Sequence, residues 1–285
     1  IRNRPFPGHY IIDKAEKNAI NKFLDSKEEL SGFLGGWNSK FYGGKNVINF
    51  ENNWSKYIKS KYTVSFNSNT SGLCSAIGAA NISPGDEVIV TPYSMSATAT
   101  AILAYQGIPV FADIDPKTFC LDPKAVLKKI NKRTKAIMVT ALFGHPSDMD
   151  SLMKIAKYNN LVVIEDAAQA PGAVYKNKKI GTKADMTVFS LNVHKHIHSG
   201  EGGMVTTNSK IYAEKLQLIR NHAESVVEDK NHKDLINCVG YNLRLTEIQA
   251  IIANEQLKKL PKLLDQRIKN ANYLSKIFVK NTPGI

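Results

Sequence analysis

The stretch Leu161-Val162-Val163-Ile164-Glu165-Asp166-Ala167-Ala168-Gln169 decides the fold. Its first four residues are apolar and largely β-branched, which favours a buried strand, and two carboxylates follow that strand directly. Similar runs lie before and after it, and the earlier ones alternate with amphipathic stretches long enough to be crossover helices. Such alternation predicts a parallel sheet covered by helices on both faces, with right-handed crossovers. The predicted strands are residues 63–66, 87–90, 109–112, 136–140, 161–164, 186–189 and 204–207.

Helices are expected on both sides of this alternating region. Asp13 followed three residues later by Glu16 is a capping-box pattern, and the apolar residues after it recur at helical spacing. A glycine-rich and aromatic loop over residues 32–44 precedes a helix that carries Phe50 and Trp54 on one face, and helices are expected from about Thr246 onward. The sequence has no internal repeat and no low-complexity linker.

The composition is that of an ordinary globular protein. The chain has 285 residues, 43% of them hydrophobic, and no run of about 18 apolar residues that could span a bilayer. It has no segment typical of a signal peptide, so a cytoplasmic location is expected. Cys74, Cys120 and Cys238 are far apart, odd in number and without CxxC spacing, and they suggest neither a zinc site nor a disulfide framework.

The formal net charge of +13 is compatible with a nucleic acid or with an anionic substrate. The lysines are spread through helix-like segments, most densely between Lys258 and Lys280, where a solvated helical face is the simplest interpretation. No basic-aromatic motif is present, so nucleic acid is not expected as a partner, whereas a phosphate-bearing substrate stays open.

Four segments fall where loops converge at the carboxyl ends of the strands, which is where parallel sheets bind ligands. Small residues at 67–73 between a strand and a helix suit a phosphate, although a plain turn uses the same residues. A carboxylate of the acidic pair Glu165 and Asp166 could hold the ring nitrogen of a cofactor protonated, or it could simply cap the next turn. The other two segments are a glycine-ended loop around Lys195 and a loop around Asn242 and Arg244.

Lys195 lies in the third of these segments. A lysine in a desolvated site has a lowered pKa, because burial disfavours the ammonium, and it becomes nucleophilic enough to form an imine. His194, His196 and His198 alternate around it and allow a zinc site as an alternative. They lack a cysteine or carboxylate partner at ligand spacing, so no metal is predicted.

Taken together and in this order, these segments resemble the DegT/StrS family of PLP-dependent sugar aminotransferases, which have the aspartate-aminotransferase fold. The resemblance covers nearly the whole chain. It is carried by PGDEVIV (84–90), PVFADIDP (109–116), EDAAQAPGA (165–173), HKHIHSGEGGM (194–204) and GYNLRLTEIQA (240–250).

The resemblance implies a role for each matching residue, beginning with Lys195 as the lysine that holds pyridoxal 5'-phosphate (PLP) as a Schiff base and shuttles a proton. Asp166 matches the carboxylate at the pyridine nitrogen. Gln169 matches the amide at the ring's hydroxyl edge. The resemblance further assigns contacts with the cofactor phosphate, made within the subunit by Thr70, Ser71 and Ser190 and across a homodimer interface by Asn242.

The implied reaction is a ping-pong transamination from an amino acid, in this family usually L-glutamate, to a keto-sugar that is usually nucleotide-linked, in sugar or cell-surface polysaccharide biosynthesis. The implied fold class is α/β, a mostly parallel sheet flanked by helices. Residues 1–250 are expected to form the PLP-binding large domain with its N-terminal helical arm. Residues 251–285 are expected to be connecting helices that lead towards a smaller C-terminal domain, cut short here.

Two departures from the family pattern concern the pocket. Ser96 stands where many members place an aromatic that stacks on the ring, so either Tyr93 or Met95 replaces it or the stacking is absent, and Pro171 replaces a common histidine. Two alternatives stay open. Relatives with histidine in place of the lysine are sugar dehydratases, although Lys195 falls in the anchoring frame five residues after Ser190. The other is a PLP-fold regulatory protein without turnover.

Overall fold

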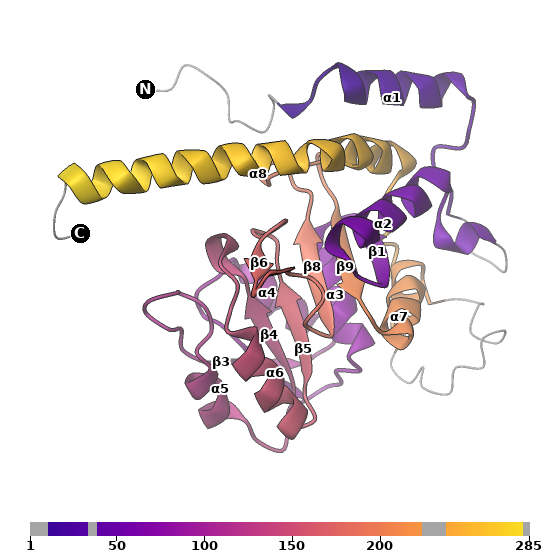
Figure 1. Cartoon of the computed structure of the whole chain (residues 1–285). Helices are drawn as coiled ribbons and strands as arrows, with labels where there is room; N and C mark the ends of the chain where they lie inside the picture. The colour runs from indigo at the N-terminus through magenta and orange to yellow at the C-terminus, as the bar shows by residue number, and fades with distance from the viewer. Residues whose placement is uncertain (1–10, 34–38, 224–237, 282–285) are drawn as a thin grey trace.

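A central sheet organises the computed structural model, which describes residues 11–33, 39–223 and 238–281. Within these ranges seven strands form one sheet, in the order β1-β9-β8-β5-β4-β2-β3 (Figure 1). A two-stranded hairpin of β6 (Val174–Tyr175) and β7 (Lys178–Lys179) lies apart from it. The sheet strands are β1 (Tyr62–Phe66), β2 (Glu87–Val90), β3 (Ile108–Phe111), β4 (Thr134–Thr140), β5 (Val162–Asp166), β8 (Met186–Ser190) and β9 (Gly203–Thr207).

The predicted mostly parallel sheet is confirmed, with an antiparallel exception at β9. From β3 through β2, β4 and β5 to β8 the pairs are parallel, but β9 runs antiparallel to both β8 and β1. A parallel return needs a crossover, usually a helix. Residues 191–202 between β8 and β9 form no helix, so the chain turns back beside β8. Residues 63–66 form β1, which runs in the same direction as the parallel strands and is separated from them by the antiparallel β9.

Helices cover both faces of the sheet, as the alternation predicts. On one face α3 (Asn69–Ala79), α4 (Ser96–Leu103) and α7 (Lys210–Arg220) pack against side chains such as Ile164 and Val188. On the other face α5 (Pro123–Lys129) and α6 (Met149–Tyr158) cover one part of the sheet. The second part of that face is covered by α2 (Lys45–Ile58) and the first half of α8 (Glu247–Asn281), which enclose Trp54 and Phe189. Short 3₁₀ turns lie at Ser39–Tyr42 and Leu142–Gly144.

The predicted N-terminal helix is α1 (Lys14–Asp25), and the capping box at its start is present. Asp13 accepts a hydrogen bond from the amide of Ala15, and Glu16 accepts one from the amide of Asp13, both at 2.8 Å. Glu16 also binds Lys259 and Gln256 of α8, which fixes α1 along that helix (Figure 1).

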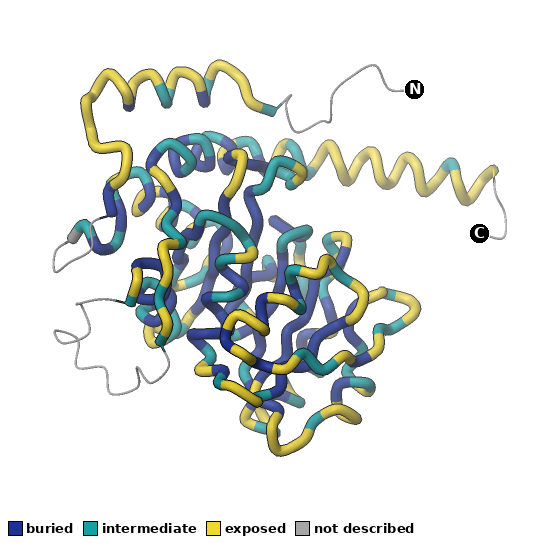
Figure 2. The backbone as a smooth tube through the Cα atoms, turned by 180° about the vertical axis from the view of Figure 1, so that it is seen from behind, coloured by how far each residue is buried: buried dark blue, intermediate teal, exposed yellow. Residues whose placement is uncertain are grey.

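The last described element is one continuous helix, α8. α8 runs through Pro261 for 35 residues, and its outer half is exposed and extends beyond the body of the molecule (Figure 2). The domain boundary predicted after residue 250 falls inside α8 and stays a prediction. In the described ranges, no helix combines the length and the apolar character needed to cross a lipid bilayer. Residues 34–38 of the predicted glycine-rich loop lie outside the described ranges.

A buried ion pair fixes α7 against α2 and β1. The guanidinium of Arg220 is fully buried and donates to Glu51 at 2.5 Å, to the carbonyl of Ser65 at 3.1 Å and to that of Tyr42 at 3.2 Å. Its carbon lies 4.7 Å from the centre of the Phe33 ring. A buried cation of this kind depends on its carboxylate partner.

We predict that Glu51→Gln lowers the free energy of unfolding by about 3–5 kcal/mol, because it leaves the buried guanidinium of Arg220 without a counter-charge. Urea unfolding measures the change. As a control, Lys40→Ala removes the exposed pair between Lys40 and Glu29 and should change stability by less than about 1 kcal/mol. Equal effects of the two substitutions would contradict the prediction.

Candidate active site

A cavity of 250 Å³ lies at the carboxyl ends of β5 and β8, beside the start of α3. Most of the residues that line it are of polar type, and it lies where the loops of a parallel sheet converge. Five of the seven site residues predicted from the sequence line it. The lining consists of Ser68, Asn69, Thr70, Ser94, Met95, Ala97, Thr140, Asp166, Ala168, Gln169, Ser190, Asn192, His194, Lys195 and Glu201.

Asp166 is the last residue of β5 and forms a buried carboxylate in this cavity. The hydroxyl of Thr98 on α4 donates to it at 2.7 Å, and the amide of Ala168 donates at 3.1 Å. Burial raises the pKa of Asp166, and the Thr98 and Ala168 hydrogen bonds and the positive charge of Lys195 oppose that rise. The site therefore holds a carboxylate that a cationic or N–H partner would stabilise.

Lys195 approaches this carboxylate from the loop 191–202. The amide of Lys195 donates to the carbonyl of Asn192 at 2.9 Å, and the amide of Ser199 donates to Leu191 at 3.1 Å, so the loop is folded back on itself. The Lys195 side chain is partly buried, and burial lowers its pKa while the charge of Asp166 opposes that change. Burial therefore favours the neutral, nucleophilic form of this amine over what an exposed lysine would show.

The start of α3 forms a corner suited to a phosphate. Ser68 caps the helix by accepting a hydrogen bond from the amide of Ser71 at 3.1 Å, and Thr70 is exposed towards the cavity. The first amides of a helix lack acceptors within it and carry partial positive charge. Ser190, at the end of β8, adds a hydroxyl on the other side of the cavity.

Gly203 at the start of β9 allows this corner to form. A Cβ atom at this position would lie 2.4 Å from the carbonyl oxygen of Ser68, which is closer than real Cβ contacts. The absence of a side chain lets the backbone of β9 approach the turn directly.

Gln169 follows β5 and is held by the loop that precedes α6. Its Oε1 accepts a hydrogen bond from the amide of Phe143 at 2.7 Å, which orients the side-chain amide. The Nε2 group is then the donor that remains for a ligand in the cavity.

Two predicted residues, Ser71 and Asn242, do not line the cavity. The hydroxyl of Ser71 donates to Asn67 at 2.6 Å within the turn. Asn242 is exposed and accepts a hydrogen bond from Arg244 at 2.8 Å, although the next residue, Leu243, binds the amide of Asn67 close to the corner.

The sequence argument did not single out Thr98, Asn69, Asn192 or Glu201. Asn192 donates to Glu201 at 2.7 Å across the loop that carries Lys195. Thr98 and Asn69 flank Asp166, and only the threonine reaches hydrogen-bond geometry. Thr98 lies in the run Thr98-Ala99-Thr100-Ala101, and nothing in the sequence distinguishes it from Thr100. Its hydrogen bond from α4 to Asp166 on β5 could therefore not be predicted.

The structure selects between the residues proposed to replace a stacking aromatic. Met95 and Ala97 line the cavity, whereas Ser96 and Tyr93 do not. The Tyr93 ring lies instead 5.8 Å from that of Phe119 and 6.5 Å from that of Phe143. The surface facing a planar ligand is therefore aliphatic.

The residues present fit PLP. One observation supports this beyond the matching side chains: Nδ2 of Asn69 is buried at the cavity and has no hydrogen-bond partner among the described residues. A bound polar group would satisfy this donor. The residues that would hold the cofactor are Lys195 at the carbonyl, Asp166 at the ring nitrogen, Gln169 at the hydroxyl edge, and Thr70 and Ser190 at the phosphate.

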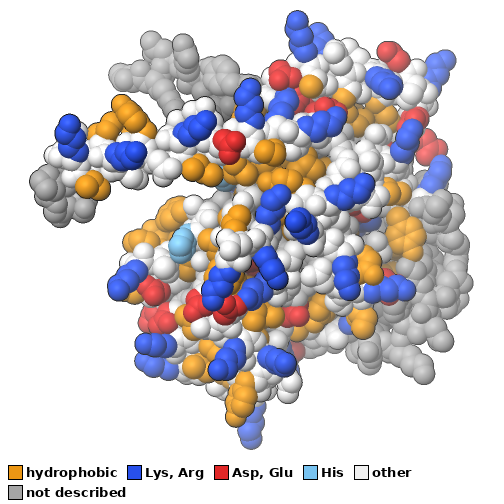
Figure 3. All heavy atoms as spheres, in the orientation of Figure 1, with side chains coloured by type: hydrophobic (Ala, Val, Ile, Leu, Met, Phe, Trp, Pro, Cys, Tyr) orange, Lys and Arg blue, Asp and Glu red, His pale blue; other side chains and the backbone are white. Residues whose placement is uncertain are grey.

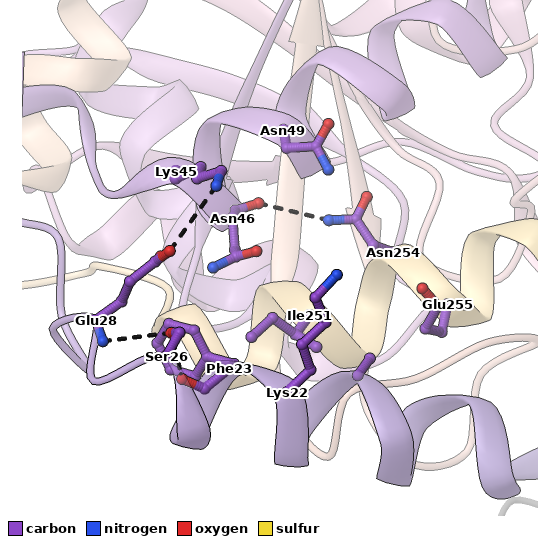
Figure 4. A pocket seen from close by; sticks show the side chains of 11 residues that line it. Lys22, Phe23, Ser26, Glu28, Lys45, Asn46, Asn49, Ile251, Asn254 and Glu255 are labelled. Carbon is purple, nitrogen blue, oxygen red and sulfur yellow. Dashed lines mark hydrogen bonds and ion pairs between the residues drawn. The ribbon is translucent and has the colours of Figure 1, made fainter.

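A different cavity of 260 Å³ lies between α1, α2 and α8 and is remote from these groups (Figure 4). Lys45 there pairs with Glu28 at 3.8 Å, and Asn254 donates to the carbonyl of Asn46 at 3.5 Å. These side chains bind one another across helix contacts, so this hollow is not a candidate for catalysis.

Comparison with known proteins agrees with this geometry. Residues 25–284 match the model of the DegT/DnrJ/EryC1/StrS aminotransferase family. The chain is 40% identical over 224 residues to a GDP-perosamine synthase of Caulobacter vibrioides. The matched region covers 79% of this chain and 59% of that relative. It therefore spans about three fifths of the length of this curated relative.

Solved structures show the same fold. The aminotransferase PseC of Helicobacter pylori, which is involved in pseudaminic acid biosynthesis, matches with a TM-score of 0.83 and 34% identity over 95% of this chain and 70% of its own. A GDP-4-keto-6-deoxymannose-3-dehydratase with a trapped PLP-glutamate geminal diamine matches with a TM-score of 0.82 and 30% identity over 95% of this chain and 72% of its own.

The lowered pKa of Lys195 gives a testable pH dependence. Since the ammonium loses its proton at lower pH than usual, modification of Lys195 by formaldehyde and cyanoborohydride should persist to lower pH than modification of the exposed Lys157. Peptide mass spectrometry at a series of pH values measures both. Asp166→Asn removes the opposing charge and should move the Lys195 profile further down. Identical profiles for the two lysines would contradict the prediction.

Proposed function

Because the chain belongs to the DegT/DnrJ/EryC1/StrS aminotransferase family, we propose that it transfers an amino group from an amino acid, L-glutamate, to a keto-sugar. The observation that carries the proposal is the meeting of Lys195 and Asp166 in one polar cavity at the end of β5. The resemblance to this family implies a ping-pong order, in which the donor and the acceptor would use the cavity one after the other.

Each residue has a task that its surroundings support. PLP, when bound, supplies an electron sink for the bond that breaks at the substrate α-carbon. The carboxylate of Asp166 holds a proton at the ring nitrogen, which keeps the ring electron-poor. The partly buried amine of Lys195 binds the cofactor and moves the proton at the α-carbon, and burial lowers its pKa, which favours the role of a general base.

The acceptor is proposed to be nucleotide-linked. The relatives named for GDP-perosamine and pseudaminic acid synthesis work in sugar biosynthesis, and the net charge of +13 favours the approach of a diphosphate. We place the reaction in sugar or cell-surface polysaccharide biosynthesis, in the cytoplasm. The proposed large domain ends at residue 250, and residues 251–285 lead towards a smaller domain.

A dehydratase function is the alternative with the nearest structural support, since one such enzyme shares this fold. The presence of Lys195 in the cavity favours transamination, because a lysine supplies both the anchor and the base. A regulatory protein without turnover has no need for Lys195, Asp166 and Gln169 together.

The active unit is proposed to be a homodimer in which Asn242 reaches the cofactor phosphate of the neighbouring subunit. Asn242 is exposed and does not line its own cavity, and an exposed polar residue close to the phosphate corner is what an interface contact requires.

We predict that Lys195→Ala abolishes the glutamate half-reaction, with a loss of at least about 10²–10⁴-fold, because the variant lacks both the anchor and the base. The absorbance of the bound cofactor, followed after addition of L-glutamate, measures this step. Lys157→Ala is the matched control and should react like the wild type. A Lys195→Ala protein that still converts glutamate at the normal rate would refute the proposal, and a deoxy-sugar product without nitrogen would favour the dehydratase.

Mixing two inactive variants tests the shared site. Lys195→Ala and Asn242→Ala proteins, dissociated and reassociated together in equal amounts, should recover about a quarter of the wild-type activity, since half the dimers are mixed and each holds one complete site. The transamination rate after mixing is the measurement. If Asn242 serves its own subunit, mixing restores nothing.

A further inference from the structure

A second large cavity lies on the opposite face of β5 from the candidate active site. It has a volume of 470 Å³ and opens between the β6–β7 hairpin, residues 180–183 and the start of α6. No residue lines both this cavity and the active-site cavity. Its lining is Met149, Glu165, Tyr175, Lys176, Lys178, Lys179, Ile180, Thr182 and Lys183.

Glu165 forms the floor of this cavity. It precedes Asp166 in β5, and successive side chains of a strand point to opposite faces, so the two carboxylates serve different cavities. Glu165 is 1% exposed, and its Oε2 accepts a hydrogen bond from Thr187 on β8 at 3.0 Å. Its Oε1 has no hydrogen-bond partner among the described residues.

This unpaired oxygen requires an explanation, because a buried polar atom without a partner costs stability. Burial raises the pKa of Glu165 to about 7, the Thr187 hydroxyl lowers it and the charge of Asp166 raises it. The amide of Gly181 comes near enough to the carboxylate to lower its pKa but does not reach hydrogen-bond geometry with Oε1. A ligand hydroxyl at the floor would supply the missing hydrogen bond in either protonation state.

The rim of the cavity is strongly cationic. Lys and Arg side chains, with acidic ones among them, gather over the β6–β7 hairpin on the face shown in Figure 3. Asp150 pairs with both Lys176 and Lys183. Among the described residues no carboxylate pairs with Lys178 or Lys179, so the rim carries more positive charge than its carboxylates balance.

The ammonium of Lys179 lies near that of Lys59, and a bound anion would reduce the repulsion between these two positive charges. Its ammonium lies 3.4 Å from the centre of the Tyr57 ring and donates to the Tyr57 carbonyl at 2.9 Å. Burial and the nearby charge of Lys59 lower the pKa of Lys179. A phosphate at this rim would be bound by several lysines acting as point charges.

We propose that this cavity is a second ligand site, which binds a small phosphorylated sugar with its phosphate among the rim lysines and a hydroxyl on Oε1 of Glu165. The volume is in the range of small-molecule sites, and the polar groups stand at two ends of it, as such a ligand needs. The site is independent of the proposed transamination, because it shares no residue with the PLP cavity.

Calorimetric titration of the PLP-saturated protein tests the proposal, since PLP then blocks the phosphate corner of the active site. The probes are glucose 6-phosphate and inorganic phosphate. Wild-type protein should bind glucose 6-phosphate more tightly. Lys176→Ala combined with Lys178→Ala should weaken both probes about tenfold or more, while the pair Lys132→Ala and Lys157→Ala, exposed and outside the cavity, should change neither appreciably.

Glu165→Leu separates the two halves of the site. The leucine side chain is similar in size but offers no hydrogen-bonding atom to a ligand hydroxyl, so glucose 6-phosphate should bind about tenfold more weakly and inorganic phosphate should not. Three results would each overturn the proposal: no binding of either probe at millimolar concentration, equal affinity of the wild type for both, or an effect of the control pair as large as that of Lys176→Ala with Lys178→Ala. If the protein showed no transamination but still bound glucose 6-phosphate in this second cavity, the proposed transamination would be refuted and the proposal of a second site would stand.

Discussion

The burial of two consecutive carboxylates at the end of β5 is the constraint on which the rest of the structure depends. A carboxylate removed from water must be given donors, and each of the two receives them from a different face of the sheet. Thr98 of α4 serves Asp166 from one side, and Thr187 of β8 serves Glu165 from the other. The central position of β5 between β4 and β8 makes both possible, because only an inner strand has covered faces and neighbours on both edges.

The antiparallel return of β9 is what brings a lysine to this carboxylate. If residues 191–202 were a crossover helix, Lys195 would lie on a helix covering the sheet instead of over the end of β5. The folded loop keeps the amine partly buried yet beside a negative charge, and the pKa of Lys195 reflects both influences. The same return places β9 next to the turn that begins α3, so one topological feature assembles the amine and the phosphate corner together.

The sequence predicted most of the fold because its strands are apolar runs whose bounds agree with the structure to within one or two residues. Strand ends predicted that the segments around Thr70, Asp166 and Lys195 meet at one edge, and the family resemblance singled out these residues together with Gln169 and Ser190, all of which line the cavity. The sequence could not predict the direction of β9, which depends on how a loop without periodicity folds. Nor could it identify Thr98 or the cavity at Glu165, because these depend on contacts between strands and helices distant in sequence. The roles of Ser71 and Asn242 rest on resemblance, and the described residues do not bring these two side chains into the cavity.

The contact between Gly203 and the carbonyl of Ser68 has a consequence for how this scaffold diversifies. The corner is shaped by main-chain atoms, which every amino acid possesses, so substitutions at most surrounding positions leave its outline intact. Side chains that line the cavity, such as Met95 and His194, take no part in this contact between main-chain atoms. Substitutions at the mouth can therefore change which ligands the cavity admits, while a single glycine preserves the geometry beneath it.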